Sequence, residues 1–296
     1  MESVAVVGVG AIGGVVAARL LEKGQCSVTL CVRTPFEKLV VETPRGVIES
    51  KVLCVTDPGQ MRPVDWVLLA TKAHHTEGAA PWLKALAGPK TVIAVLHNGV
   101  EHVERVAPYA NGARVLPVVV NCPADKAGLG RMVHRGSVRL VPPDDEQGRG
   151  LARLFEGTDV EVPPSKDILT DLWTKLCTNC AQSPITGLTR RRREVLRLPE
   201  VSEVSLALAR ECAAVGRAVG AKLPESLPED IVARQKKMSP DATTSMLTDA
   251  WEGKPLETDA FTGAVIRAGE KHGIPTPVTR IVHALSSAIN RGAERL

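Results

Sequence analysis

The first half of the chain alternates strand-like apolar runs with helical patterns, which predicts an α/β fold. Short apolar runs are typical of strands that are buried on both faces of a parallel sheet. Such strands are predicted at 4–7, 27–32, 64–70 and 92–96. A helical pattern follows the first of them and ends at Gly24, so the chain begins with a strand, a turn and a helix.

Further elements are predicted before a domain boundary near residue 165. In order they are a β-rich excursion at 40–55, strands at 115–120 and 132–140 around a polar loop at 124–130, a helix at 151–155 and a strand at 160–162. We expect the strands at 115–120 and 132–140 to join the parallel sheet as antiparallel neighbours. The boundary follows Pro163 and Pro164, because a Pro-Pro step ends regular structure.

The second half is predicted to be helical throughout. Helical spacing appears at about 167–183, 201–219, 227–237, 243–252, 257–272 and 277–293, with Gly or Pro between the segments. The expected architecture is therefore a Rossmann-type dinucleotide-binding domain at 1–165 and an all-helical domain at 166–296. In this plan the substrate lies in a cleft between the domains.

Composition and charge exclude several classes of protein. Of the 296 residues, 44% are hydrophobic and 24% charged, which is typical of a globular protein without a membrane span. The net charge of +4 is scattered, and the basic run Arg190–Arg193 lacks aromatic neighbours, so we expect no nucleic-acid partner. The start of the chain enters a strand directly, and we expect a cytoplasmic protein.

Cysteine and histidine spacing gives no metal site. The seven cysteines have no framework spacing, and Cys177-x-x-Cys180 lacks a second ligand pair for zinc. His74 and His75 lack a third ligand, so we interpret them as surface residues at the start of a helix.

A glycine motif after the first strand predicts a dinucleotide site. Gly8-x-Gly10-x-x-Gly13, with Val9, Ala11 and Ile12 between the glycines, stands between a strand and a helix, which is the context that this fingerprint requires. Gly8 makes the tight turn, Gly10 lets the backbone approach the pyrophosphate, and Gly13 packs the helix against the sheet. The free N–H groups of the helix then favour the negative charge.

The residue after the second strand favours NADP(H) over NAD(H). NAD-binding chains carry Asp or Glu about twenty residues after the glycines, where it accepts from the ribose hydroxyls. This chain has Arg33 there, whose guanidinium would pair with the 2′-phosphate of NADP, with Thr34 nearby. Lys72 and Asn98 each follow a predicted parallel strand, so we expect both at the edge of the sheet where ligands bind.

One predicted helix carries a polar stripe. Lys175, Asn179 and Ser183 recur every fourth residue and share a face, and Pro184 is expected to end or kink the helix. An ordinary explanation is that the lysine snorkels to water from an amphipathic helix. Glu257 begins a later helix, where an N-terminal carboxylate can be explained by the helix dipole alone.

Taken together, these motifs resemble the ketopantoate reductase (2-dehydropantoate 2-reductase) family over the whole chain. The segments that carry the resemblance are Gly8-x-Gly10-x-x-Gly13, Arg33, Lys72, Asn98-Gly99, Trp173-x-Lys175-Leu176-x-x-Asn179, Ser245-Met246-x-x-Asp249 and Glu257-x-Asp259-x-x-x-Gly263. The resemblance implies NADPH-dependent reduction of a 2-oxo acid to a 2-hydroxy acid. It also implies a C-terminal domain like that of 6-phosphogluconate dehydrogenase.

The resemblance assigns roles residue by residue. Lys175 would be the general acid, and Asn98 and Asn179 would orient cofactor and substrate. Ser245 would hold the substrate carboxylate, and Glu257 would contact the substrate hydroxyl or the cofactor near the lysine. Cys122 would border the nicotinamide. The apolar C-terminal helices leave room for a homodimer interface.

One position departs from the family pattern. Eight residues after the lysine the family typically has a second asparagine that binds substrate, whereas this chain has Ser183. Ketopantoate therefore competes with another 2-oxo acid or an imine as the substrate. A non-catalytic NADP(H)-sensing protein is the alternative of another class, because a fold alone does not fix a function.

Overall fold

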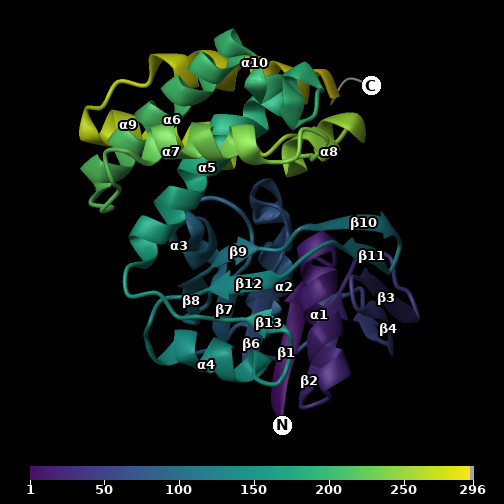
Figure 1. Cartoon of the computed structure of the whole chain (residues 1–296). Coiled ribbons are helices and arrows are strands. Elements are labelled where there is room, and N and C mark those ends of the chain that lie inside the picture. Colours follow the sequence, from purple (N-terminus) through teal and green to yellow (C-terminus); the bar gives the residue numbers. More distant parts are fainter. Residues whose placement is uncertain (294–296) are drawn as a thin grey trace. The chain divides into compact units, whose positions relative to one another are not determined.

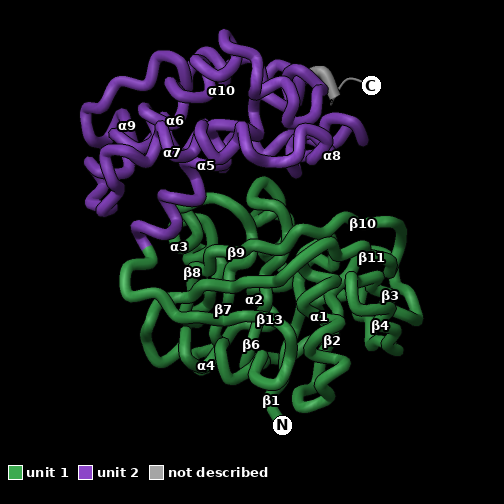
Figure 2. Tube along the Cα trace, viewed as in Figure 1, with its two compact units in different colours: residues 1–168 green, residues 169–296 purple. Residues whose placement is uncertain are grey.

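The computed structural model describes residues 1–293 and divides the chain into two compact units (Figure 2). Unit 1 is Met1–Ile168 and unit 2 is Leu169–Leu296. The division falls at residue 168, beside the boundary expected near residue 165. Within the described residues all strands lie in unit 1 and unit 2 contains helices, which confirms the predicted fold class.

Unit 1 is built on a six-stranded sheet in which every neighbouring pair of strands is parallel (Figure 1). In spatial order the strands are β5 (Leu53–Val55), β2 (Cys26–Cys31), β1 (Glu2–Val7), β6 (Trp66–Leu69), β7 (Val92–Val95) and β8 (Arg114–Pro117). The strand order reverses beside β1, and in open α/β sheets ligands bind outside the carboxyl ends of the strands at such a point.

Alternate residues of the strands enter two separate cores. On β1, Val4 and Val6 belong to the core on one face, whereas Ala5 and Val7 belong to the core on the other. All four are at most 2% exposed, as a strand covered on both faces requires. Helix α1 (Ala11–Lys23) covers the first face and α2 (Ala80–Leu86) the second.

The other strands form two smaller mixed sheets, each with antiparallel pairing and one parallel pair. One has the order β10 (Ala124–Gly128), β11 (Arg131–His134), β3 (Lys38–Thr43), β4 (Gly46–Lys51), and the other β13 (Val160–Glu161), β12 (Val138–Val141), β9 (Val119–Asn121). The expected strand at 115–120 is divided: its first part joins the parallel sheet as β8, but parallel to β7, and its last part is β9. The expectation of antiparallel neighbours in the parallel sheet is therefore wrong. The expected loop at 124–130 contains β10. Apolar residues of the smaller sheets, such as Met132 and Leu140, are buried in the core on the α1 side.

Short helices complete unit 1. They are α3 (His102–Val106), α4 (Glu146–Phe155) and the 3₁₀ turns η1 (Pro58–Gln60), η2 (Ala73–His75), η3 (Glu77–Ala79) and η4 (Ala107–Tyr109). Asp145 caps α4, since its carboxylate accepts from the Gly148 N–H at 2.8 Å.

Unit 2 is an assembly of helices. They are α5 (Ile168–Thr189), the 3₁₀ turn η5 (Arg193–Arg197), α6 (Pro199–Val219), α7 (Leu227–Lys237), α8 (Ser245–Trp251), a π-helical turn (Asp259–Gly263), α9 (Ala264–His272) and α10 (Pro277–Ala293). No helix among the described residues is long and apolar enough to cross a membrane.

Pro184 lies inside α5, which continues to Thr189, so of the two effects predicted for this residue the end of the helix is wrong. A proline removes one helical N–H, but burial of the surrounding turn compensates for it. Residues 180–187 are all buried, and Ser205 on α6 donates to the Ala181 carbonyl at 2.6 Å. Contacts between the helices therefore decide where α5 ends.

Candidate functional site

The glycine loop between β1 and α1 has the geometry that a pyrophosphate needs. Gly8 has φ +93°, and a Cβ there would lie 2.6 Å from the Thr71 backbone nitrogen. A Cβ on Gly13 would lie 2.1 Å from the Gly8 carbonyl oxygen, so α1 packs directly on the turn. At Gly10 a Cβ would meet nothing within 4 Å, which leaves this side open to a ligand. The loop therefore fits a dinucleotide.

Arg33 and Lys72 form a basic edge near this loop. Arg33 is exposed just after β2, and Lys72 is half-buried just after β6. Burial lowers the pKa of His75, and the positive charges of Arg33 and Lys72 lower it further. Both charges act on the same imidazole, so each cation lies near His75, and both follow strands of the parallel sheet at the carboxyl ends where a phosphate can bind.

Two buried histidines support the Asn98 loop. His97 and His102 stack edge to face with ring centroids 4.9 Å apart. His97 Nδ1 donates to the Asn98 carbonyl at 2.9 Å, and His102 Nε2 donates to the His97 carbonyl at 3.1 Å. Burial lowers the pKa of His97 to about 4, so its ring is neutral at pH 7. Gly99 follows with φ +117°, which completes a turn directly after β7.

The remaining unit 1 candidates lie at their expected elements. Val9, Ala11 and Ile12 are half-buried in the glycine loop and the first turn of α1. Cys122 is half-buried just after β9. His75 is exposed and His74 half-buried on η2. Within the described residues, no group of three or more His, Cys, Asp or Glu side chains could hold a metal ion.

In unit 2, α5 carries the predicted polar stripe. Lys175 and Asn179 are half-buried, whereas Ser183 is only 2% exposed. The opposite side of the helix is buried through Trp173 and Leu176. Lys175 is thus held on a helix whose other face is anchored in the core, which limits the positions that its ammonium group can reach.

The other unit 2 candidates differ in exposure. Ser245 is exposed at the first position of α8, where the cap is Thr244, whose hydroxyl accepts from the Leu247 N–H at 3.2 Å. Glu257 is 4% exposed and stands just before the π-helical turn. A carboxylate so deeply buried is costly unless it is paired, and π-helical turns occur frequently at functional sites. The segment at 257–272, predicted as one helix, therefore begins irregularly.

The buried cysteines of unit 2 are thiols. Cys177 and Cys180 on α5 pack against Cys212 on α6, and none is more than 1% exposed. Burial and the neighbouring thiols raise the pKa of Cys212 well above its usual value. A buried thiol with a raised pKa is a poor nucleophile, so this cluster contributes packing.

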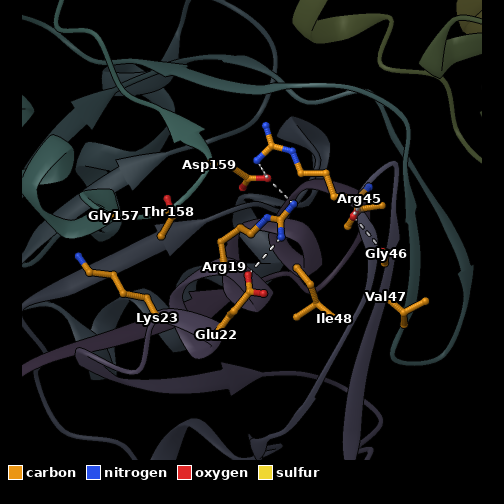
Figure 3. Close-up of a pocket in the computed structure, with 11 residues that line it drawn as sticks. Arg19, Glu22, Lys23, Arg45, Gly46, Val47, Ile48, Gly157, Thr158 and Asp159 are labelled. Atoms are coloured by element: carbon orange, nitrogen blue, oxygen red, sulfur yellow. Dashed lines mark hydrogen bonds and ion pairs between the residues drawn. The ribbon is translucent and has the colours of Figure 1, made fainter.

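Sequence reasoning missed the two histidines behind Asn98 and an ion-pair cluster around Arg19. His97 directly follows an apolar run and precedes Asn98, and this position could have indicated the histidine pair, since a buried histidine needs a hydrogen-bond partner. The ion-pair cluster joins Arg19 to Asp159, which is 140 residues away in the chain, and no local pattern connects them (Figure 3).

Comparison with known proteins covers both units. The family model described as "Ketopantoate reductase PanE/ApbA" matches residues 4–145, and the model of its C-terminal part matches residues 167–290. The 2-dehydropantoate 2-reductase of Caulobacter vibrioides is 40% identical over 288 residues, which cover 97% of this chain and 99% of that protein.

Solved structures agree in fold along nearly the whole chain. A PanE/ApbA family ketopantoate reductase from Ralstonia eutropha JMP134 has a TM-score of 0.89 at 30% identity, covering 99% of both chains. A ketopantoate reductase from Staphylococcus aureus, described as dimeric, has a TM-score of 0.88 at 23% identity and covers 98% of this chain and 99% of its own.

Proposed function

Because the chain belongs to the ketopantoate reductase family, we propose that it reduces 2-dehydropantoate (ketopantoate) to pantoate with NADPH. The Caulobacter vibrioides relative is a 2-dehydropantoate 2-reductase, and the protein is accordingly an oxidoreductase that acts on a CH–OH group. The observation that carries the proposal is the half-buried Lys175–Asn179 face of α5 in a chain that also has an open, glycine-lined dinucleotide loop.

The preference for NADPH over NADH rests on Arg33 and Lys72. NAD-binding folds use a carboxylate to accept from the ribose hydroxyls, and such a group would repel a 2′-phosphate. The position after β2 instead carries the Arg33 guanidinium. Lys72 supplies a second cation, and the charges of both lower the pKa of His75. Planar guanidinium groups bind phosphate through paired N–H donors, so this edge suits the 2′-phosphate.

Lys175 is the proposed proton donor. Bound NADPH supplies the hydride that adds to the carbonyl carbon of the 2-oxo acid. Negative charge then builds on the carbonyl oxygen, and the Lys175 ammonium donates a proton to that oxygen, giving the hydroxyl group of the product. General acid catalysis of this kind contributes on the order of 10²–10⁴ in rate.

The neighbouring polar groups have positioning roles in this proposal. The Asn179 amide stands one helical turn after Lys175 and can bond the substrate, and Asn98 orients substrate and cofactor at the edge of the sheet. The buried carboxylate of Glu257 contacts the substrate hydroxyl or the cofactor near the lysine. Ser245, exposed at the first turn of α8, binds the substrate carboxylate, and Cys122 borders the nicotinamide.

The nature of the 2-oxo acid depends on Ser183. Its side chain is 2% exposed and shorter than the asparagine that is typical of the family, so it leaves the site without that amide donor. A missing polar contact in a closed site changes discrimination between substrates by large factors. A reductase of another 2-oxo acid or an imine is therefore the second candidate function.

A panel assay separates these functions from a non-catalytic NADP(H)-binding role. NADPH consumption is followed with ketopantoate, other 2-oxo acids and cyclic imines, while calorimetry measures NADPH binding. We expect ketopantoate to give the highest kcat/KM. A higher value with another substrate would assign the second candidate, and tight NADPH binding without turnover on any substrate would identify a sensor.

The exposed face of α10 supports a homodimer. Ile281, Leu285 and Ile289 are 61%, 55% and 39% exposed, and the exposed Ala284 and Ala288 fill the same stripe. Positions at spacings of three and four make one helix face, and small residues between large ones allow another helix to approach closely. A two-fold dimer buries the same patch on both copies, so α10 would pack on α10.

Sedimentation measurements test this interface. Leu285→Glu places a charge in the middle of the stripe and should shift the protein from dimer to monomer. Leu129→Glu is the matched control, because Leu129 is 52% exposed in unit 1 and lies outside the stripe. An unchanged mass for Leu285→Glu, or a monomeric unaltered protein, would contradict the proposal.

A further inference from the structure

The inner side of α10 is polar. An amphipathic helix normally packs its apolar face inward, but α10 exposes its apolar stripe through Leu285 and turns polar residues inward on the opposite side. These residues recur at spacings of four, three and four, and they are Thr279, His283, Ser286 and Asn290. Polar side chains on the packed side of a helix need partners, so their partners indicate which segments α10 fixes.

Two of the four residues have partners that fix only α10 itself. Thr279 donates to the Glu211 carboxylate on α6 at 2.6 Å, which anchors the first turn of α10. Ser286 donates to a carbonyl oxygen of its own helix at 2.9 Å, which satisfies a buried hydroxyl. The remaining two residues instead contact the segment that carries Glu257.

Asn290 makes two hydrogen bonds to the backbone of one residue, Leu256. Its Nδ2 donates to the Leu256 carbonyl oxygen at 3.0 Å, and its Oδ1 accepts from the Leu256 N–H at 2.8 Å. Leu256 lies in the stretch 254–257, which has no regular secondary structure and so offers its backbone no helical or strand partner. The Asn290 amide therefore fixes the backbone directly before Glu257.

The side chain of Leu256 is fixed as well. It is 2% exposed and lies near α5 at Gly187, where an added Cβ would come within 3.6 Å of Leu256 Cδ1. Gly187 belongs to the helix that carries Lys175. Leu256 is thus held by α5 through its side chain and by α10 through its backbone. Both contacts restrict where Glu257, the next residue, can lie relative to α5.

His283 anchors the turn that follows Glu257. Its Nδ1 lies 2.9 Å from the Thr262 hydroxyl, which donates to the Thr258 carbonyl oxygen at 3.0 Å. The single hydroxyl proton is used in that second bond, so His283 Nδ1 is the donor in the first. Thr258 and Thr262 are at most 2% exposed. One side of α10 therefore holds the chain both before and after Glu257.

We propose that Asn290 is a positioning residue that places the Glu257 carboxylate for the reaction. This inference rests on the proposed function, in which that carboxylate contacts the substrate hydroxyl or the cofactor near the lysine. Glu257 is 4% exposed, and a side chain in a close-packed interior has little freedom to compensate for a shift of its own backbone. A misplacement of about 1 Å can lower a rate about a hundredfold.

A double-mutant cycle tests this role on the full chain with ketopantoate and NADPH. Asn290→Ala should lower kcat/KM about tenfold to a hundredfold. Arg291→Ala, at the next and exposed residue of α10, is the matched control and should leave kcat/KM unchanged. In a Glu257→Gln background, Asn290→Ala should lower kcat/KM by at most about twofold further, because the group that it positions is already lost.

Equal fractional losses in the two backgrounds would show a merely structural role for Asn290 and overturn the proposal, as would an unchanged kcat/KM for Asn290→Ala. Circular dichroism shows whether the variants fold. Asn290→Asp is the second variant: it keeps the acceptor for the Leu256 N–H, loses the donor to the carbonyl at neutral pH, and should show the same dependence on Glu257.

NMR of side-chain carboxyl carbons gives a result that does not depend on turnover. The Glu257 signal, assigned by its disappearance in Glu257→Gln, should shift in Asn290→Ala and stay in place in Arg291→Ala. A protein that turns over no 2-oxo acid would refute the proposed function, and this signal would still decide whether Asn290 places Glu257. An unchanged Glu257 signal in Asn290→Ala would overturn the inference.

Discussion

Replacing Arg33 by alanine should reduce the preference of the protein for NADPH over NADH. Charge-assisted hydrogen bonds contribute about 1.5–3 kcal/mol each, and the exposure of Arg33 favours the lower end of that range. A loss of about 1.5 kcal/mol corresponds to about a tenfold drop in kcat/KM with NADPH. The kcat/KM with NADH should change little, because NADH has no 2′-phosphate for the guanidinium to contact.

The Lys72→Ala variant should show the same selective loss, because its ammonium belongs to the same basic edge. The assay measures kcat/KM with both cofactors for the unaltered protein, each variant and an Arg62→Ala control. Arg62 is an exposed unit 1 arginine that donates to the Met61 carbonyl. The pKa of His75 gives an independent reading: removing either cation should raise it, since both charges now lower it. Equal losses with NADPH and NADH, or an unchanged ratio, would refute this explanation of cofactor choice.

Two further predictions concern the loops that carry the candidate residues. Gly13→Ala should abolish NADPH binding in calorimetry, since its Cβ would lie 2.1 Å from the Gly8 carbonyl oxygen; Gly24→Ala, at the far end of α1, should leave binding intact. His97 should lower the free energy of unfolding in acid, because its pKa in the folded protein is about 4 and the unfolded chain therefore binds more protons as the pH falls below 6.5. At pH 5 the unfolding free energy should be lower by about 2 kcal/mol, at 1.36 kcal/mol per pH unit. Urea unfolding of His97→Gln should lack this decrease, and identical pH profiles for the variant and the unaltered protein would contradict the assignment.

The sequence was informative where structure is decided by neighbouring residues. The β1 apolar run, the glycine turn and the α1 pattern are local, and the turn leaves no space for a Cβ at Gly8 or Gly13. The polar stripe of α5 was also readable, because helical spacing alone places Lys175 and Asn179 on one face.

Features that depend on long-range packing were not readable. The pairing of β9 with β12 joins Val120 to Leu140, and the apolar pattern is equally compatible with an extension of the parallel sheet. The continuation of α5 beyond Pro184 depends on burial by neighbouring helices, which outweighs the local effect of a proline. The Arg19–Asp159 pair likewise requires the complete fold of unit 1.

In the proposed reaction Lys175 protonates the carbonyl oxygen of the substrate. The most direct measurement is kcat with ketopantoate and the dissociation constant of NADPH for Lys175→Ala, with Lys236→Ala on the exposed side of α7 as the control. We expect a fall in kcat on the order of 10²–10⁴, with NADPH affinity unchanged and the control fully active. A decrease in kcat of less than tenfold, or a parallel loss of NADPH affinity, would contradict this role of Lys175.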